Sequence, residues 1–411
     1  MLDLSPPAKE VRSLASWMSK QNCSPECVIY DIGSTNPFKE FLSLVPSSRV
    51  LCHIIVSIAA LHQAQREPND SQMLAEDTSG HELDTTKTLT KLPKYYEYLY
   101  HKQQALYLLR TQYQGAPFQD TNGVIASILM FVWLECLECG RNTWAYHLNA
   151  LKEIMQARSL SMDLVDSKNV SSAFSRFYEF FDTSYAIFEI LGSTLVKSKQ
   201  QYKPLFSRTP TLDILNRSEL LTWTGCPAEL LYIVSLVNSA TLDPMVQAPS
   251  LICFLFSRVL GFSPYRWALS SPNMSHLTSR YHISCIYKAA VLIYMSQVFF
   301  TLSRQYYLFG ADSSASLDSI IMHFASIDTQ DPHFKGLLWP AFIIGGEARS
   351  EAQRARITKV FQDLWTLWRA HNIKHAFGVL KKIWGRQTTT DGTSQPWIEF
   401  IYEQGENWMF V

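Results

Sequence analysis

The chain has few charged residues and no long hydrophobic run. Only 18% of its 411 residues are Asp, Glu, Lys or Arg, against about a quarter in ordinary soluble domains. The longest apolar run, residues 124–134, is too short to cross a bilayer, so we expect no membrane contact. The first residues, Met1 to Pro7, lack the basic and apolar regions of a signal peptide. A reducing compartment without disulfides is therefore expected.

Signatures of common enzymes are also missing. The sequence contains no Gly-x-Ser-x-Gly, no phosphate-binding Gly-rich loop and no His-Glu-x-x-His. Two Asp-x-x-Asp pairs, Asp163/Asp166 and Asp328/Asp331, resemble the acidic motifs of helical terpene cyclases, but no matching second motif follows them. We therefore expect no catalytic residues, no metal site and no cofactor, and an enzyme is the less favoured interpretation.

Eight cysteines are present, and their spacing does not favour metal or redox chemistry. Cys136 and Cys139 end an apolar helical stretch, whereas redox Cys-x-x-Cys motifs need a helix N-terminus. Cys23 and Cys27 supply two thiolates, which cannot complete a tetrahedral zinc site. Both pairs are predicted to be structural.

What the sequence does have is apolar and helical in pattern. Hydrophobic residues make up 47% and aromatic residues 13% of the chain, enough for a sizeable core. The apolar spacing predicts an all-α protein, a compact multi-helix array of about a dozen helices with irregular insertions. The expected helices cover about 49–66, 95–113, 120–139, 143–158, 171–191, 228–241, 246–260, 276–307, 315–326, 336–349, 350–371 and 373–385, before a final aromatic segment 397–411.

Two stretches of polar or irregular composition shape the domain organisation. Residues 1–45 read as a poorly structured leader with a short helix near 11–20, and 46–411 as one helical domain. Within that domain we expect a mobile acidic loop at about 67–94 and an irregular connection at about 192–227. The helices at 95–113, 120–139 and 143–158 have short connections and should pack as antiparallel neighbours.

Residues 337–348, Leu-Leu-Trp-Pro-Ala-Phe-Ile-Ile-Gly-Gly-Glu-Ala, form the most distinctive segment. Pro340 suits the first turn of a helix, where its missing N–H costs nothing. The apolar residues after it should enter the core, and Gly345-Gly346 should let another backbone approach closely.

Four blocks in order resemble the fungal-specific transcription factor domain, the regulatory region of fungal binuclear zinc-cluster regulators. They are Tyr95–Arg110, Ala126–Arg158 with its Trp144-x-x-His147-Leu148, Tyr287–Met295, and Gly336–Trp384 followed by the Trp397 tail. The chain departs from the pattern at Asn149-Ala150, where Gly-Ala is usual. A larger departure is that Cys23 and Cys27 stand in place of a basic six-cysteine cluster, so we expect the zinc cluster to be lacking.

The resemblance implies transcriptional regulation in the nucleus, with the cytoplasm as the alternative. The chain would act through a protein partner, self-association or a small apolar ligand. Because Lys plus Arg and Asp plus Glu are both 36, no direct nucleic-acid binding is expected. The alternative is a helical scaffold recruited as an enzyme of fungal secondary metabolism, acting on an apolar intermediate in an aromatic-lined pocket.

Three residues are weak candidates for ligand binding: His101, His147 and Glu347. His147 is predicted to be structural, bridging neighbouring helices, and Glu347 is predicted to pair with Arg354 or with an Arg or His of another helix. Glu135 and Glu138 also need partners, because buried carboxylates are costly when unpaired. The basic stretch Arg349–Arg386, with nine Lys or Arg and two acids, is predicted to be the solvated face of an amphipathic helix.

Overall fold

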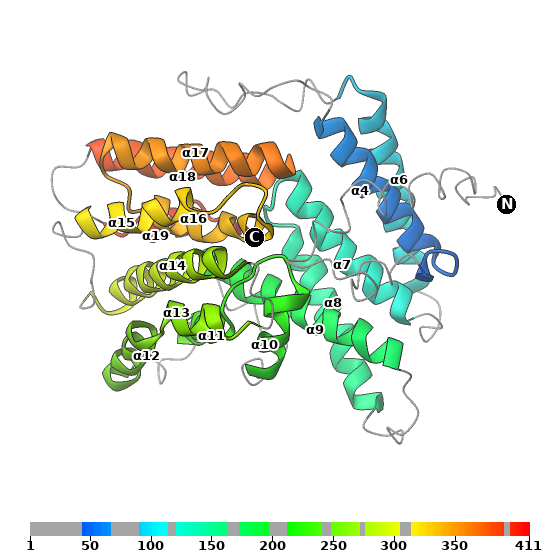
Figure 1. Cartoon of the computed structure of the whole chain (residues 1–411). Coiled ribbons are helices and arrows are strands. Elements are labelled where there is room, and N and C mark those ends of the chain that lie inside the picture. The colour runs from blue at the N-terminus through cyan, green and yellow to red at the C-terminus, as the bar shows by residue number, and fades with distance from the viewer. Residues whose placement is uncertain are drawn as a thin grey trace. The chain divides into compact units, whose positions relative to one another are not determined.

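The computed structural model describes residues 43–66, 90–113, 121–162, 172–196, 212–240, 248–271, 276–304, 314–389 and 395–411. These residues form fifteen α-helices and two 3₁₀ helices, and no β-strand occurs within them (Figure 1). The predicted all-α fold is confirmed. The chain divides into two compact units: unit 1 comprises residues 1–178 with 368–371, and unit 2 comprises residues 179–367 with 372–411.

Unit 1 is built around α4. Its complete helices are α4 (Arg49–Arg66), α6 (Pro93–Tyr113), α7 (Thr121–Glu138) and α8 (Trp144–Met162). Helix α4 packs along both α6 and α7, and α7 packs along α8. The expectation that α6 and α7 would be direct antiparallel neighbours is therefore wrong, because α4 is the main neighbour of both.

The sequence of α4 explains this central position. Almost every side chain from Val50 to Gln65 is buried, so the helix presents apolar groups in all directions rather than along one stripe. The turn from α7 to α8 is tight: Gly140 and Asn142 both adopt left-handed backbone angles, with φ of 63° and 58°. Glycine adopts this conformation without strain, which ends α7 near the predicted position.

Unit 2 holds the rest of the helices. They are the end of α9 (Ser172–Gly192), η3 (Ser193–Leu195), α10 (Leu212–Leu221), α11 (Ala228–Ala240), α12 (Pro249–Gly261), α13 (Pro264–Leu269), α14 (Leu277–Ser303), α15 (Ser314–Ala325), η8 (Pro332–Leu337), α16 (Leu338–Gly345), α17 (Glu351–Trp368), α18 (His371–Thr389) and α19 (Trp397–Glu403).

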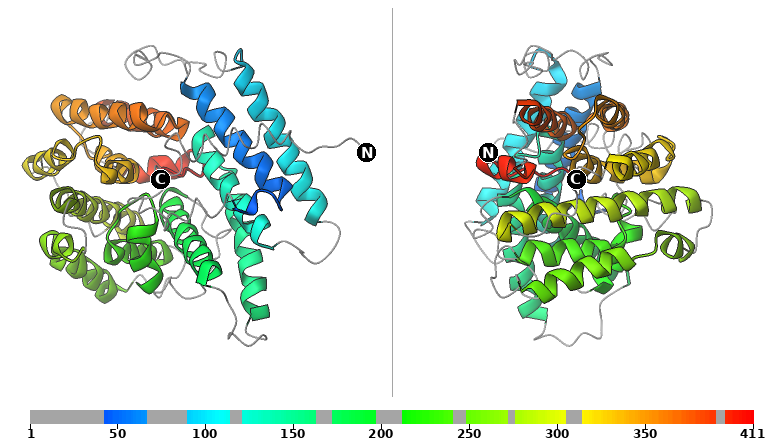
Figure 2. Two further views of the ribbon diagram at one scale, coloured as in Figure 1. Left: turned by 45° about the vertical axis from the view of Figure 1, so that its right-hand side comes forward. Right: turned by 90° about the vertical axis from the view of Figure 1, so that its left-hand side faces the viewer.

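Helix α14 is the centre of unit 2. It contacts α11, α12 and α13 as well as α15, α16, η8 and α19, and the views in Figure 2 show it between these two sets. It is also the one described helix long and apolar enough to cross a bilayer, but 78% of its most apolar window is buried inside the structure. Its hydrophobic sequence is that of a core helix.

The segment 337–348 forms α16, whose eight residues are all buried. Pro340 lies in its first turn, as predicted. The prediction for the glycine pair is wrong in one respect, because side chains rather than a backbone approach it. A Cβ on Gly345 would lie 2.8 Å from Leu380 Cδ2, and one on Gly346 would lie 2.6 Å from Trp397 Cε2.

The dozen predicted helices all occur, with ends shifted by a few residues. Three short α-helices were not predicted: α10, which lies inside the expected irregular connection 192–227, α13, and α19, which lies in the final aromatic segment. Helix α6 begins at Pro93, within the expected loop 67–94. The predicted leader helix near 11–20, the loop residues 67–89, and Cys23, Cys27, Asp163 and Asp166 lie outside the described residues.

Candidate functional site

The three candidate residues do not converge on one site. His101 lies on α6 and His147 on α8, both in unit 1, whereas Glu347 follows α16 in unit 2. Each has its own set of neighbours.

His101 pairs with a second histidine on the adjacent helix. Its Nδ1 lies 2.8 Å from Nδ1 of His53 on α4, so one ring donates and the other accepts. Both side chains are buried. Burial, followed by the neighbouring His53, lowers the pKa of His101 to about 4. A neutral hydrogen-bonded pair thus joins α4 to α6.

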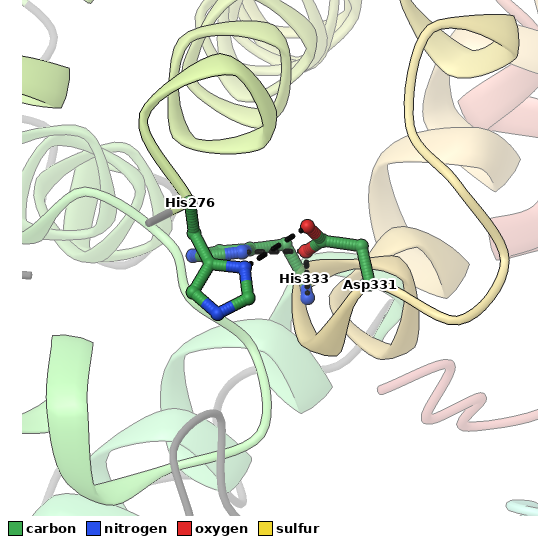
Figure 3. Close-up of side chains that lie close together, drawn as sticks. All are labelled: His276, Asp331 and His333. Atoms are coloured by element: carbon green, nitrogen blue, oxygen red, sulfur yellow. Dashed lines mark hydrogen bonds and ion pairs between the residues drawn. The ribbon is translucent and has the colours of Figure 1, made fainter. Parts of the chain in front are cut away.

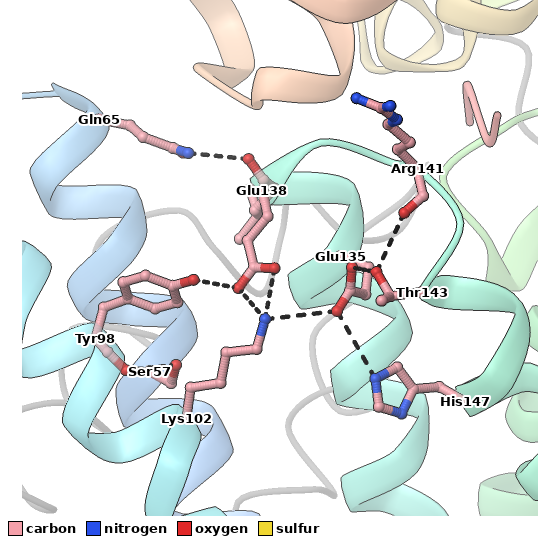
Figure 4. Close-up of polar contacts among 10 residues, drawn as sticks. Ser57, Gln65, Tyr98, Lys102, Glu135, Glu138, Arg141, Thr143 and His147 are labelled. Atoms are coloured by element: carbon pink, nitrogen blue, oxygen red, sulfur yellow. Dashed lines mark hydrogen bonds and ion pairs between the residues drawn. The ribbon is translucent and has the colours of Figure 1, made fainter. Parts of the chain in front are cut away.

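A polar network joins α6 to α7 beside this pair (Figure 4). Lys102 Nζ lies 2.6 Å from both carboxylate oxygens of Glu138 and 3.5 Å from Oε1 of Glu135. The hydroxyl of Tyr98 donates to Glu138, and that of Thr143 donates to Glu135. Burial alone would lower the pKa of Lys102, but the two carboxylates outweigh it and raise the pKa. The two acids therefore have the partners that their burial requires.

His147 extends the network to α8. Its Nε2 lies 3.7 Å from Oε1 of Glu135, and its ring stacks on Phe131 of α7 with centroids 4.9 Å apart. Burial would raise the pKa of Glu135, but its contacts with His147, Lys102 and Thr143 lower it. The structure thus confirms that His147 bridges neighbouring helices.

Glu347 is buried in unit 2, and its predicted pairing with Arg354, or with an Arg or His of another helix, is wrong. Its Oε1 accepts hydrogen bonds from Gln297 Nε2 at 2.6 Å and Trp397 Nε1 at 2.9 Å. Arg354 instead donates to the carbonyl of Ala348 and to Gln387. Burial raises the pKa of Glu347. The carboxyl serves as an acceptor that ties α14 and α19 to the end of α16.

The cysteine pair and the basic stretch behave as predicted structural features. Cys136 and Cys139 are free thiols, and burial raises the pKa of Cys139 to about 11, opposite to a reactive thiol. On α17 the apolar side chains face inward. Arg356 and Lys359 are exposed, and they form ion pairs with the carboxylates of Asp318 and Asp363, respectively.

The outward face of α6 exposes a row of large apolar side chains. Five large side chains spaced at helical intervals are exposed: Tyr96, Leu99, Tyr100, Leu106 and Tyr107. Tyr98, His101 and Ala105 on the opposite face are buried. We call the five exposed residues the α6 face. Helix α6 is therefore apolar on both sides, and only one side is buried within its unit.

The structure also assembles a cluster that sequence reasoning missed. The carboxylate of Asp331, at the start of η8, contacts both His333 of η8 and His276 at the start of α14 (Figure 3). Burial would raise the pKa of Asp331, but hydrogen bonds from His333, Ser279 and His276 outweigh it and lower the pKa. Asp331 and His276 are 55 residues apart, so no local spacing signalled the cluster.

Comparison with known proteins agrees with the resemblance seen in the sequence. The sequence profile described as "Fungal specific transcription factor domain" matches residues 20–242 and 259–411. A relative is the "Acriflavine sensitivity control protein acr-2" of Neurospora crassa, 21% identical over 360 residues, which are 83% of this chain and 56% of that protein. The chain thus spans little more than half the length of this relative, and no solved structure matches. Because the profile covers most of the sequence, the chain belongs to the fungal specific transcription factor domain family.

Proposed function

We propose that this protein regulates transcription in the fungal nucleus by binding another protein through the α6 face. Membership of the family supports the regulatory role, and so does the relative, which is named as a control protein. The observation that carries the mode of action is the exposure of three tyrosines and two leucines along one side of one helix.

The chemistry of the α6 face suits a protein partner. Aromatic residues, tyrosine above all, are enriched where binding energy concentrates in protein interfaces. Tyr96 is 62% exposed and Tyr107 is 56% exposed, so their rings are largely in contact with solvent. An amphipathic helix of a second regulator would bury these rings while its polar side stays in water.

The interior of unit 1 supports the same role. Helix α6 is joined to α4 by the His53–His101 hydrogen bond and to α7 by the Lys102–Glu138 ion pair. These fixed contacts hold the backbone of α6, so the exposed side chains are presented on a rigid element. A rigid surface loses less conformational entropy on binding than a flexible one.

A reporter experiment tests the proposal. The chain, fused to an unrelated DNA-binding domain, is placed upstream of a reporter gene in a fungal host. We expect the fusion to change reporter output, and the triple variant Tyr96→Gln, Tyr100→Gln, Tyr107→Gln to abolish that change.

The matched control removes equally exposed apolar groups from unit 2, with Phe254→Gln, Leu260→Gln and Tyr265→Gln. This control should act like the unsubstituted chain. A fusion without effect, or an α6 variant as active as the control, would show that the α6 face is not the regulatory contact.

A further inference from the structure

The His276–Asp331–His333 cluster has the composition and spacing of a metal site. Asp331 Oδ2 lies 3.1 Å from Nδ1 of His276, and Oδ1 lies 2.8 Å from Nδ1 of His333. One ligand atom from each of the three residues lies within 4.8 Å of the other two. Imidazole nitrogen and carboxylate oxygen are ligands of Zn²⁺ and similar divalent ions.

The observed separations are close to those of a bound ion. Ligand atoms held about 2.0–2.1 Å from a tetrahedral Zn²⁺ lie roughly 3.3 Å from one another. The two nitrogen–oxygen distances run to different oxygens of Asp331 and are somewhat shorter, and one atom from each residue lies within 4.8 Å of the others. A small movement of one ring would place all three atoms around an ion. His276 is the more accessible ring, since its side chain is 27% exposed while that of His333 is fully buried.

Neighbouring groups orient the carboxylate in the way that supporting residues orient metal ligands. The hydroxyl of Ser279 donates to Oδ2 at 2.5 Å, and the backbone N–H of His333 donates to Oδ1 at 2.9 Å. Such second contacts fix the ligand geometry before an ion arrives. When the two Nδ1 atoms bind an ion instead of Asp331, each carboxylate oxygen keeps only one of these contacts and has a lone pair for the ion.

The nearby cationic side chain of Arg280 has partners outside the cluster. Arg280 follows Ser279 on α14, and its guanidinium stacks 3.8 Å from the ring of Trp267 and lies 4.0 Å from the carboxylate of Glu219. Arg280 is thus held by Trp267 and Glu219, while the carboxylate of Asp331 is the acidic group in direct contact with both imidazoles.

We propose that His276, Asp331 and His333 bind one divalent transition-metal ion of the zinc class. The ion would fasten the start of α14, the central helix of unit 2, to η8, which leads into α16. Three protein ligands leave a fourth position for water on the side of the exposed His276. Because one ligand is exposed, the ion would exchange with solvent.

Metal titration of the full chain tests the site. Co²⁺ is added to metal-free protein while visible absorption is recorded, and Zn²⁺ is then added as competitor. We expect saturation at one ion per chain, displacement by Zn²⁺, and a rise in Tm with Zn²⁺. His276→Gln, at a partly exposed position that should tolerate it, should weaken binding by roughly tenfold or more.

His282→Gln is the matched control. His282 lies on α14, whose N-cap residue is His276, and its Nδ1 is 2.7 Å from Nδ1 of His323. The substitution therefore removes a histidine from a two-histidine contact and leaves the proposed metal ligands unchanged. Binding unchanged by His282→Gln supports the site. Absence of saturable binding, equal binding by His276→Gln, or loss of binding on His282→Gln overturns it. Circular dichroism spectra of both variants check that each keeps the fold of the unsubstituted protein.

Discussion

Gly336 lies where the structure has no room for a side chain. A Cβ at this position would be 1.9 Å from the carbonyl oxygen of Thr224. The carbonyl of Gly336 accepts a hydrogen bond from the hydroxyl of Tyr287 at 2.7 Å, and the ring of Tyr287 stacks on Trp339 of α16. The close approach of two backbones thus occurs just before α16 rather than at the glycine pair at its end.

Gly336→Ala should therefore destabilise the protein by roughly 3 kcal/mol, because a backbone atom rather than a flexible side chain blocks the new methyl group. Gly378→Ala is the control: it lies inside α18 with open space around it, and should stabilise by about 1 kcal/mol. Denaturant unfolding monitored by circular dichroism measures both. Equal effects of the two substitutions would contradict the packing described.

Glu347 is a second residue whose surroundings decide its chemistry. Glu347→Gln keeps an oxygen to accept from Gln297 and Trp397, and should change stability little. Glu347→Leu leaves both buried donors unpaired and should cost roughly 2 kcal/mol or more.

The pH dependence adds a separate readout at this residue. Because burial raises the folded-state pKa of Glu347 above its ordinary 4.5, the folded protein binds the proton more tightly than the unfolded chain. Its contribution to stability therefore falls as pH rises above about 4.5. Glu347→Gln should lack this decline in unfolding measurements. A parallel pH profile for both proteins would contradict the assignment.

At the scale of elements, ion pairs in unit 1 join helices that have few backbone contacts. Lys102 of α6 reaches Glu138 and Glu135 of α7, although α4 is the main neighbour of both helices. Lys102→Met would leave two largely buried carboxylates without their cation, at a cost of roughly 3 kcal/mol.

The same helix supplies the control, since Lys94 pairs with Glu97 at a more exposed position. Lys94→Met should change the free energy of unfolding by less than about 0.5 kcal/mol. Adding Glu138→Gln to Lys102→Met should recover part of the loss. A Lys102 effect no larger than that of Lys94 would show that the network does not hold α6 to α7.

The His53–His101 pair predicts an acid sensitivity of the α4–α6 contact. The folded-state pKa of His101, about 4, is below its ordinary 6.5, so the unfolded chain binds more protons between these values. Stability should fall as pH drops from 6.5 towards 4, with His101 contributing roughly 1–2 kcal/mol. In His101→Gln, unfolding curves should show a shallower decline over this range and no change in slope above pH 7.

Local patterns predicted the elements far better than their contacts. Periodic apolar spacing located α17, which buries one face, and continuous apolar sequence located α4 and α14, which are buried nearly all round. The Trp144-x-x-His147 pattern indicated a helix bridge. The partners of Glu347 were missed because Gln297 and Trp397 are each 50 residues away. Short α10 and α13 have too few residues for a periodic signal.

For the whole molecule, the family assignment and the surface chemistry suggest one account. The family profile matches residues of both units, and unit 1 presents the α6 face. The triple substitution of Tyr96, Tyr100 and Tyr107 removes exposed rings, of which that of Tyr100 also contacts His101 edge-on, so it should alter the free energy of unfolding by about 1 kcal/mol. Loss of regulation with an intact fold would separate function from stability.

Transcript profiling of a deletion strain is the most direct test that this protein regulates transcription through the α6 face. Deleting the gene should change a defined set of transcripts. Complementation with the unsubstituted chain or the Phe254/Leu260/Tyr265 control should restore them, whereas the α6 triple variant should not. An unchanged transcript profile on deletion, or full restoration by the α6 variant, would contradict the account.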